Sequence, residues 1–459
     1  MRLFLLSAFT VITACSGSDP VDGVCCTSLD NCAELKLDEL RPCKAGQACV
    51  DHLCVVPACA TNGCQASAPV CSFETAACSG CRDAADCSTF GAADVCEPTS
   101  GACVECIGAS DCEAGRPVCD AGSCRQCKLD TECASGACGE DGRCVAEAAI
   151  VYLTPTGIDT GLCTRAAPCV GWGFAFSKTS TSRSHIVMAT GPYSEEFGPG
   201  GFTDAASVTV HGGGSTMTFA SAEHFFNAAV PTLLRDLTIT TDGSSLRGPV
   251  SLDRVKVTSR SGPVIETASI ITIRDSELEA PAAGNPAISM SSGANVTIDR
   301  ARIRGGRNSL ASFGAGVNVK LTNVLVHGAS QVALNLPMVA GTIDFSTITD
   351  SGSAITSGTR MLVCSPELLV RSSILWDLSV PPRAPISGGC TVQNVIAGPA
   401  AVAGAMNIDP VFVDVPARDF HIAPNSPAKD LVDVGPALDF EGDVRPRGAR
   451  FDIGADEAP

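Results

Sequence analysis

The chain has 459 residues and a formal net charge of −18 at pH 7, with 31 Lys and Arg against 49 Asp and Glu. This length is enough for two or three domains. The acidic balance excludes a nucleic-acid-binding surface of the usual kind, because phosphate contacts need clustered Lys and Arg. We therefore expect no nucleic acid partner and an acidic, solvated exterior.

The N-terminal stretch MRLFLLSAFTVITACSGSD has the pattern of a secretory signal over residues 1–14. Arg2 supplies the positive charge, and the apolar run that follows it is too short to span a bilayer. The ending ITAC resembles the lipobox of bacterial lipoproteins. This resemblance implies that Cys15 is lipidated, begins the mature chain and binds the membrane. It further implies an outer-membrane lipoprotein at the cell surface, since neither Ser16 nor Gly17 is the Asp that causes inner-membrane retention. The alternative is ordinary cleavage, with Cys15 in a disulfide.

The cysteines indicate a complete set of disulfides. The chain has 27 of them, and removing Cys15 leaves 26. These fall into three even groups: 22 within residues 25–144, the pair Cys163 and Cys169, and the pair Cys364 and Cys390. Even groups in an exported chain favour disulfides over reactive thiols.

A cysteine-rich region is expected over residues 25–147, after a linker at 15–24. It contains a repeat that starts at Cys81, Cys106 and Cys127, and each copy opens C-x5-C with an acidic residue before the second cysteine. Four cysteines in about 20 residues imply two disulfides per repeat, because such units are too small to bury a core. The sequence leaves the connectivity open.

Two alternatives concern what these repeats do. Their C-x2-C pairs are similar to zinc knuckles, but they fall at repeat junctions and His52 is the region's one histidine, so we expect no metal. The spacing resembles small cysteine-rich repeats of myxobacterial-type secreted proteins and of the dickkopf-like fold. That resemblance implies a stalk or a protein-binding module.

Short apolar strands recur from residue 150 to about 405 at spacings of 18 to 27 residues. Aligned by their first inward residue, they begin at Leu234, Leu252, Ile273, Ile298, Leu321, Ile343 and Val370. One strand per repeat at this period predicts a mainly β solenoid of stacked parallel strands. The first and sixth aligned positions are aliphatic throughout and are predicted to face the core.

Charged residues between these aliphatic positions alternate in sign from one repeat to the next. The position after the first aliphatic residue is Arg235, then Asp253, Arg274 and Asp299. In a parallel stack such residues lie about 4.8 Å apart, so opposite charges attract. We interpret them as outward charge ladders of the scaffold, not as a catalytic cluster.

The start of this region carries a family resemblance. The stretch VYLTPTGIDTGLCTRAAPCVGWGFAF, followed by IVMATGPYSEE and VTVHGGG, resembles the entrance of the pectin lyase-like superfamily. The resemblance implies a right-handed parallel β-helix with a Cys163–Cys169 loop. It also implies a capping helix over residues 170–178, with Trp172 and Phe176 covering the first coil.

The end of the chain resembles a narrower group. The segment NIDPVFVDVPARDFHIAPNSPAKDL, with DFEGDVRPRGARFDIGADE after it, is similar to the choice-of-anchor Q domain of bacterial surface proteins. This implies a C-terminal cap over residues 406–459.

A candidate site follows from the turn after each aligned strand. Stacking would bring a set of acid, base and aromatic side chains to one edge: Glu279, Arg304, His327, Asp350, Asp377 and Trp376. Glycosidases need two carboxylates about 5–10 Å apart, and polysaccharide lyases of this shape need a basic residue with a carboxylate cluster. The alternative is polar turn chemistry at a β-helix corner.

No cofactor is expected, although acidic residues near the C-terminus could bind calcium: Asp409, Asp414, Asp439, Asp443, Asp452 and Asp456. Turn roles are the commoner explanation for Asp. The fold does not determine the function. We favour a non-catalytic role in surface binding, adhesion or structure, towards polysaccharide or a surface protein. The alternatives are a polysaccharide lyase or glycoside hydrolase, and protein binding by the cysteine repeats.

Overall fold

The structure, a computed structural model, describes residues 43, 47–50, 53–55, 62–72, 77–195, 203–219, 226–244, 246–281, 284–349, 361–379, 382 and 384–459. Most of the cysteine-rich region forms one compact unit, and the β-helix forms a second. Residues 129–138 of the last cysteine repeat belong to the second unit. The predicted signal segment and Cys15 lie outside the described residues. Among the described helices, none has the length and apolar character needed to cross a membrane.

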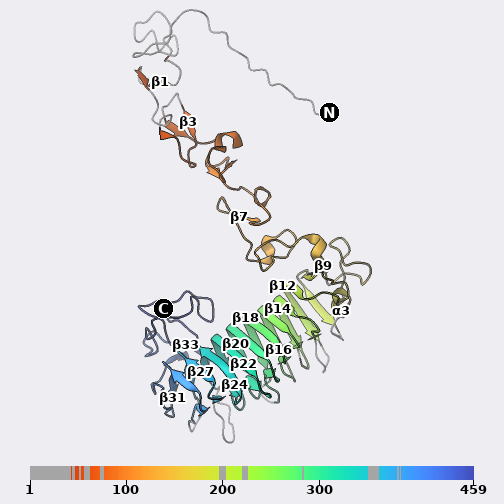
Figure 1. Cartoon of the computed structure of the whole chain (residues 1–459), viewed down its shortest axis with the longest axis vertical. Coiled ribbons are helices and arrows are strands. Elements are labelled where there is room, and N and C mark those ends of the chain that lie inside the picture. The colour runs from red at the N-terminus through yellow and green to blue at the C-terminus, as the bar shows by residue number, and fades with distance from the viewer. Residues whose placement is uncertain are drawn as a thin grey trace, which may run out of the picture. The chain divides into compact units, whose positions relative to one another are not determined.

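The cysteine-rich unit is built from short antiparallel hairpins (Figure 1). They are β1 (Ala48–Val50) with β2 (Leu53–Val55), β3 (Val70–Ser72) with β4 (Ala77–Ser79), β5 (Val95–Cys96) with β6 (Cys103–Val104), and β7 (Val118–Asp120) with β8 (Ser123–Arg125). Short 3-10 helices, η1 (Ala84–Cys87) and η2 (Ala109–Asp111), follow the repeat starts.

Disulfides join first to third and second to fourth cysteine in the two repeats whose pairing is described. The bonds are Cys81–Cys96 with Cys87–Cys103, and Cys106–Cys119 with Cys112–Cys124. The sequence had left this connectivity open. Crosslinks of this kind replace the hydrophobic core that so short a repeat cannot form.

The acidic residue before the second cysteine has a structural role in each repeat. Asp86 accepts a hydrogen bond from the backbone N–H of Arg82 at 2.9 Å. Asp111 accepts from the backbone N–H groups of Ile107 and Gly108 at 2.8 and 3.0 Å. The carboxylate therefore satisfies backbone donors at the start of its own repeat.

The β-helix has two parallel sheets among the described residues. The larger has 15 strands: β9 (Ile150–Leu153), β10 (His185–Met188), β11 (Pro192–Glu195), β12 (Val208–Phe219), β14 (Thr232–Thr241), β16 (Val250–Ser259), β18 (Ile270–Ala280), β20 (Asn295–Gly305), β22 (Val317–His327), β24 (Val339–Asp344), β25 (Thr347–Thr349), β27 (Leu368–Arg371), β28 (Ile374–Trp376), β30 (Thr391–Gln393) and β31 (Ile396–Gly398). The smaller has eight: β13 (Phe226–Asn227), β15 (Leu246–Arg247), β17 (Ile265–Thr267), β19 (Ile288–Met290), β21 (Leu310–Ser312), β23 (Leu334–Leu336), β26 (Leu362–Cys364) and β29 (Ile386–Gly388).

The strand register confirms the alignment made from the sequence. Leu234 pairs with Leu252, Leu252 with Ile273, and Ile273 with Ile298. These side chains are 0–1% exposed and form one continuous core inside the coils. The predicted mainly β solenoid is therefore correct, and the strands stack in the order of the chain (Figure 1).

One residue per coil, near the middle of strands β14 to β22 or between the paired short strands that follow them, has a left-handed backbone with φ between 46° and 55°. We call this row the bend column: Asp236, Arg254, Asp275, Arg300, Asn323, Phe345, Ser372 and Asn394. The left-handed region is unfavourable for residues other than Gly, Asn and Asp. The bend turns the strand and interrupts its ladder, as between β24 and β25.

The entrance to the first coil is closed by a short helix. Helix α3 (Trp172–Phe176) is shorter than the expected 170–178. Trp172 and Phe176 are each 1% exposed, and their ring centroids are 5.0 Å apart. A disulfide joins Cys163 to Cys169 beside this helix in the same core. These contacts cover the end of the solenoid with apolar side chains.

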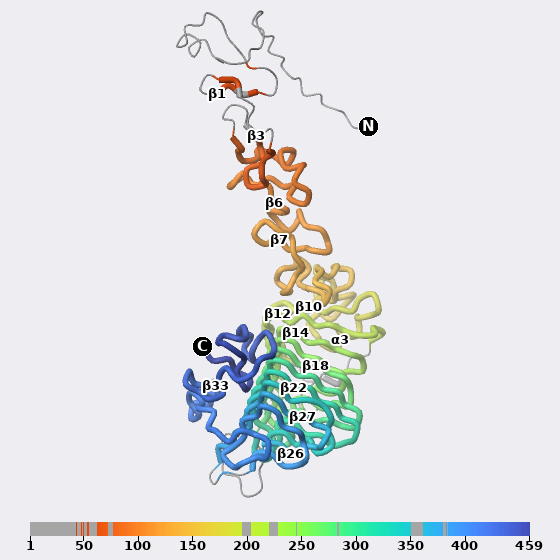
Figure 2. Tube along the Cα trace, turned by 60° about the vertical axis from the view of Figure 1, so that its left-hand side comes forward, coloured from red at the N-terminus to blue at the C-terminus, as the bar shows by residue number. Residues whose placement is uncertain are grey.

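The C-terminal segment, residues 406–459, packs on the outer side of the later coils (Figure 2). It contains the hairpin of β32 (Phe412–Asp414) and β33 (Asp419–Ile422). Ile422 and Ile453 pack with Trp376, while Phe420 and Phe440 belong to a cluster with Leu325. The segment therefore buries outward-facing side chains of the sheet.

Candidate binding groove

A groove of about 740 Å³ runs along the outer surface of strands β12, β14, β16, β18 and β20. Its floor consists of two rows, the first half of the bend column and a parallel row two residues further on. The second row, here called the outer column, is Thr238, Lys256, Glu277 and Arg302. Residues 129–131 form one end of the groove, and Phe440 and Glu441 form the other. The predicted charge ladder of Arg235, Asp253, Arg274 and Asp299 lies next to the bend column in the sequence and is not itself among the lining residues.

The first two coils of the floor contain a unit of two aspartates around one arginine. Arg254 donates from Nε and Nη2 to the two carboxylate oxygens of Asp236, at 2.8 and 2.9 Å. Its Nη1 donates to Asp253 at 2.9 Å. The hydrogen bonds to Asp236 raise the pKa of Arg254, so the guanidinium stays charged.

The next two coils repeat this arrangement. Arg300 donates from Nε and Nη2 to Asp275 at 2.6 and 3.0 Å, and from Nη1 to Asp299 at 2.5 Å. The hydrogen bonds to Asp275 raise the pKa of Arg300 in the same way. We call these two clusters, Asp236–Arg254–Asp253 and Asp275–Arg300–Asp299, the first and second Asp–Arg–Asp units. They differ in place along the groove but not in composition or bonding pattern.

The outer column is also paired. Lys256 Nζ lies 2.9 Å from a carboxylate oxygen of Glu277. Arg302 lies 3.7 Å from Glu441 and holds its guanidinium 5.6 Å from the ring centre of Phe440. All four cationic side chains that line the groove therefore have a carboxylate partner.

Asp130 closes one end of the groove from η3 (Asp130–Glu132). Its Oδ1 accepts from His211 Nδ1 and from the backbone N–H of Cys138, each at 2.8 Å. His211 Nε2 lies 3.0 Å from His185 Nδ1. Although burial alone favours the neutral acid, the hydrogen bond from His211 lowers the pKa of Asp130. An ionised Asp130 needs a donor at His211 Nδ1, which leaves His211 Nε2 to accept from His185.

At the other end, Glu441 joins the floor to the C-terminal segment. Its carboxylate contacts Arg302 and also lies 2.9 Å from His421 Nε2, while Asp419 bonds to His421 Nδ1. Burial alone would lower the pKa of His421, but its hydrogen bonds to Asp419 and Glu441 raise it to about 9. His421 is therefore a cation at neutral pH and holds the end of the groove in place.

The candidate ridge predicted from the sequence is only partly open to solvent. Glu279 pairs in register with Arg304 and lies 3.1 Å from it, and Arg304 pairs in register with His327. His327 is 4% exposed, and its ring centre lies 5.2 Å from that of Phe420 in the C-terminal segment. Burial, and then the positive charge of Arg302, lowers the pKa of His327 to about 4. The sequence thus placed these residues in one row but did not show that His327 is covered.

The rest of the ridge is buried where it is described. Asp377 is 4% exposed and accepts hydrogen bonds from the backbone N–H and the hydroxyl of Ser379, at 2.9 and 2.8 Å. Trp376 is 9% exposed and packs against the C-terminal segment. Asp350 lies outside the described residues. A catalytic role for this ridge stays a prediction.

The C-terminal acidic residues mostly accept backbone hydrogen bonds. Asp439 accepts from the backbone N–H groups of Glu441 and Asp443, at 3.0 and 2.9 Å. Asp452 accepts from Asp430 and Ala458, and Asp456 accepts from Ile422. These bonds fix turns of the C-terminal segment. Calcium binding here remains an untested prediction, as does the expectation that no cofactor is bound.

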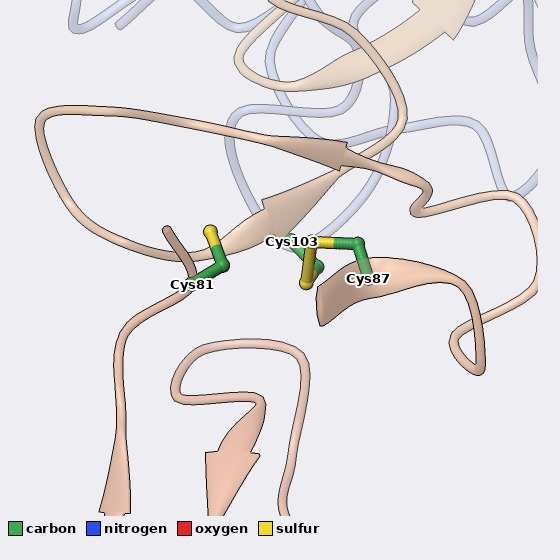
Figure 3. Close-up of side chains that lie close together, drawn as sticks. All are labelled: Cys81, Cys87 and Cys103. Atoms are coloured by element: carbon green, nitrogen blue, oxygen red, sulfur yellow. A yellow bond between two sulfur atoms is a disulfide. The ribbon is translucent and has the colours of Figure 1, made fainter. Parts of the chain in front are cut away.

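Groups of three cysteines lie close enough for metal ligation in the repeats, for example Cys81, Cys87 and Cys103 (Figure 3). All of them are disulfide-bonded, so they offer no thiolate to a metal. In the β-helix, Cys364 is bonded to Cys390 across neighbouring coils. The proposed lipid site, Cys15, lies outside the described residues.

Comparison with solved structures gives a structural neighbour at a low TM-score. No known protein family matches the sequence, and no curated protein matches it. The structure is similar to a crystal structure of pectate lyase Pel9A, at 14% sequence identity and a TM-score of 0.33, over 68% of this chain and 96% of that one. The function proposed below therefore rests on the side chains of this chain and their geometry.

Proposed function

We propose that this chain is a surface protein, anchored by a lipid at Cys15, that binds a polysaccharide along the groove without cleaving it. The observation that supports binding is the groove itself, whose floor consists of charged side chains from successive coils between two end walls. Five strands at a spacing of about 4.8 Å give a floor roughly 20 Å long. A floor of this length suits an extended polymer better than a small metabolite.

The chemistry of the groove argues against two other extended polymers. Five carboxylates line it against four cationic side chains, so it has no positive field for a phosphate backbone. A peptide that binds as an added strand needs a free sheet edge, but strands β14, β16, β18 and β20 are each paired on both sides. Sugar hydroxyls, which both donate and accept, suit a floor of alternating carboxylates and guanidinium groups.

The same contacts favour binding without catalysis. A lyase base must give up its proton, yet the hydrogen bonds to Asp236 and Asp275 raise the pKa values of Arg254 and Arg300. A glycosidase needs one carboxylic acid free to donate a proton. Asp236, Asp275, Glu277 and Glu441 are each engaged with a cation. The pKa of the fifth lining carboxylate, Asp130, is lowered by its hydrogen bond from His211, although burial opposes this. The groove is therefore built to hold a ligand rather than to transfer protons.

The test compares retention with cleavage. The purified chain is applied to arrays of neutral and acidic glycans, and the same glycans in solution are assayed for reducing ends and unsaturated products. We expect retention without product release. Thr238→Met fills the groove floor and should weaken retention by about tenfold or more, a change of roughly 1.4 kcal/mol. Thr240→Met is the matched control, because Thr240 lies on the same face of β14 but not among the residues that line the groove.

Each other outcome contradicts a part of the proposal. Product release would favour the lyase or glycosidase alternative. If Thr238→Met and Thr240→Met weaken glycan retention equally, the ligand binds outside the groove. No retention of any glycan would contradict the proposal and direct attention to a protein partner of the cysteine repeats.

A further inference from the structure

The two Asp–Arg–Asp units are separated by two coils. Asp236 and Arg254 lie on β14 and β16, and Asp275 and Arg300 lie on β18 and β20. In both units the arginine uses the same three nitrogens on the same two aspartate positions. Two strand spacings amount to about 10 Å, so the bend-column row of the groove floor repeats itself at that distance.

This repeat matches a particular class of polymer. One sugar of an extended chain advances by about one strand spacing, and in flat ribbon-like chains successive sugars are turned over. Such a chain presents the same edge again after two sugars. A ligand that follows the groove would place equivalent hydroxyl groups over the two units, one disaccharide apart.

The charges indicate that the ligand is uncharged. Each arginine is already bound to two aspartates, so an acidic sugar would have to displace a carboxylate to reach a guanidinium. The aspartates keep lone pairs for hydroxyl donors. Asp130, at the end of the groove, is 8% exposed and has one oxygen, Oδ2, without a hydrogen-bond partner among the described residues. A buried carboxylate oxygen that lacks a donor favours a ligand that brings a hydroxyl group over a ligand that brings a negative charge.

We propose that the two Asp–Arg–Asp units are equivalent subsites for a linear, uncharged polysaccharide, one disaccharide repeat apart. The inference rests on the proposed function, because it requires that a glycan lies in the groove. It names the class of glycan, and it predicts how binding depends on chain length. A disaccharide fills either subsite, and a tetrasaccharide fills both.

The experiment uses titration calorimetry on the full chain with oligosaccharides of two, three, four and six sugars. The neutral probes are β-1,4-, β-1,3- and α-1,4-linked glucose and β-1,4-linked N-acetylglucosamine, and the acidic probe is α-1,4-linked galacturonate. We expect a neutral series to bind at least about tenfold more tightly at four sugars than at three, with little gain at six. Asp236→Asn and Asp275→Asn should each remove the gain at four sugars and leave disaccharide binding within twofold.

The control variant is Asp242→Asn. Asp242 pairs with Arg260 at 2.5 Å across the same two coils as the first unit, but it does not line the groove. The Asp242→Asn variant should bind every oligosaccharide probe with the same affinity as the unchanged chain. All three variants should keep their melting temperatures within a few degrees, which shows that they fold.

The failures are distinguishable. Equal or tighter binding of galacturonate, or a smooth dependence on length that neither Asn variant alters, would overturn the two-subsite proposal. If Thr238→Met still weakens retention and Thr240→Met does not, the proposal that a glycan binds in the groove would survive that result. No binding of any probe, neutral or acidic, would overturn both proposals together.

Discussion

The bend column has two halves that differ in charge and in what covers them. On β14 to β20 it carries Asp236, Arg254, Asp275 and Arg300, which line the open groove. From β22 onward it carries Asn323, Phe345, Ser372 and Asn394. Asn323 is fully buried and donates to the carbonyl of Leu438 in the C-terminal segment at 2.9 Å. The charged half is open, and the uncharged half lies largely beneath that segment.

The backbone does not explain this difference, because all eight residues have φ values between 46° and 55°. The same bend accepts Asp, Arg, Asn, Phe and Ser. The outer column changes at the same point, since Arg302 pairs in register with Leu325, which is 3% exposed. Coverage therefore selects the side chain, and charged residues occur where the column is open to solvent.

The largest effect is expected at Arg445, which holds the cover in place. Its guanidinium lies 3.0 Å from Glu457, and both side chains are 0% exposed. It also donates to Asn323 at 3.2 Å and to the carbonyl of Gly454 at 2.9 Å. Arg445→Met leaves Glu457 buried without its cation and should destabilise the C-terminal segment by about 3–5 kcal/mol, measured by denaturant unfolding and hydrogen exchange.

The control is the double variant Arg445→Met with Glu457→Gln, which removes the unpaired charge. It should recover part of the lost stability. If the double variant is as unstable as the single one, the pair is not the feature that holds the segment.

The second prediction exchanges one residue between the halves. Leu325→Arg places a charge under Phe420 and should cost roughly 3 kcal/mol or more, because burying an ion costs several kcal/mol. The reciprocal change, Arg302→Leu, removes one partly exposed ion pair and should alter the unfolding free energy by less than about 1 kcal/mol. Both unfolding free energies are measured by chemical denaturation. If the two substitutions reduce the unfolding free energy by similar amounts, coverage by the C-terminal segment is not what distinguishes the two halves.

Much of the fold was predictable, since the period of aliphatic residues and the alternating charges gave the coils and their register. The bend column was not. Asp and Asn tolerate a left-handed backbone, but Arg254, Arg300 and Phe345 carry no local sign of it. The charge ladders were assigned correctly to the outer surface. The groove next to them was not predictable, because its end walls at residues 129–131 and at Phe440 are remote in sequence.

For the candidate ridge, too, the sequence predicted the position of the residues but not what covers them. The spacing placed Glu279, Arg304 and His327 in one row, as the register shows. Nothing near His327 in the sequence indicates that Phe420 covers it. One signal was available: the charges of the bend column stop at Asn323. A ladder that turns from charged to uncharged at one coil marks where another segment begins to cover it.

The third prediction concerns pH at the two ends of the groove. Burial, more than any neighbouring charge, lowers the pKa of His185 to about 4 from a usual 6.5. Between pH 6.5 and 4 the unfolded chain binds more protons than the folded one, so the contact with η3 should weaken as pH falls. His421 has a pKa raised to about 9, so its contribution is complete below pH 6.5 and is lost as pH rises towards 9.

Hydrogen exchange measured across this pH range should therefore show opposite trends at the two ends. Protection of residues 129–138 should decrease towards acid, and protection of residues 419–441 should decrease towards alkali. His185→Gln and His421→Gln should each flatten the trend at one end. Parallel trends at both ends would contradict this assignment.

The smallest effect on stability is expected from the ion pairs of the open half. Its size distinguishes charges that stabilise the fold from charges that serve a ligand. Lys256 and Glu277 lie 2.9 Å apart with side chains 48% and 36% exposed. A double-mutant cycle with Lys256→Met and Glu277→Gln should give a coupling energy below about 1 kcal/mol that shrinks as salt is added. The same cycle on Arg445 and Glu457 should give a far larger, salt-insensitive value. A coupling of several kcal/mol for Lys256 and Glu277 would mean that the open half is held together by its charges, as the covered half is by Arg445. The charged floor would then be explained by stability, and the argument that it is kept for a ligand would lose its basis.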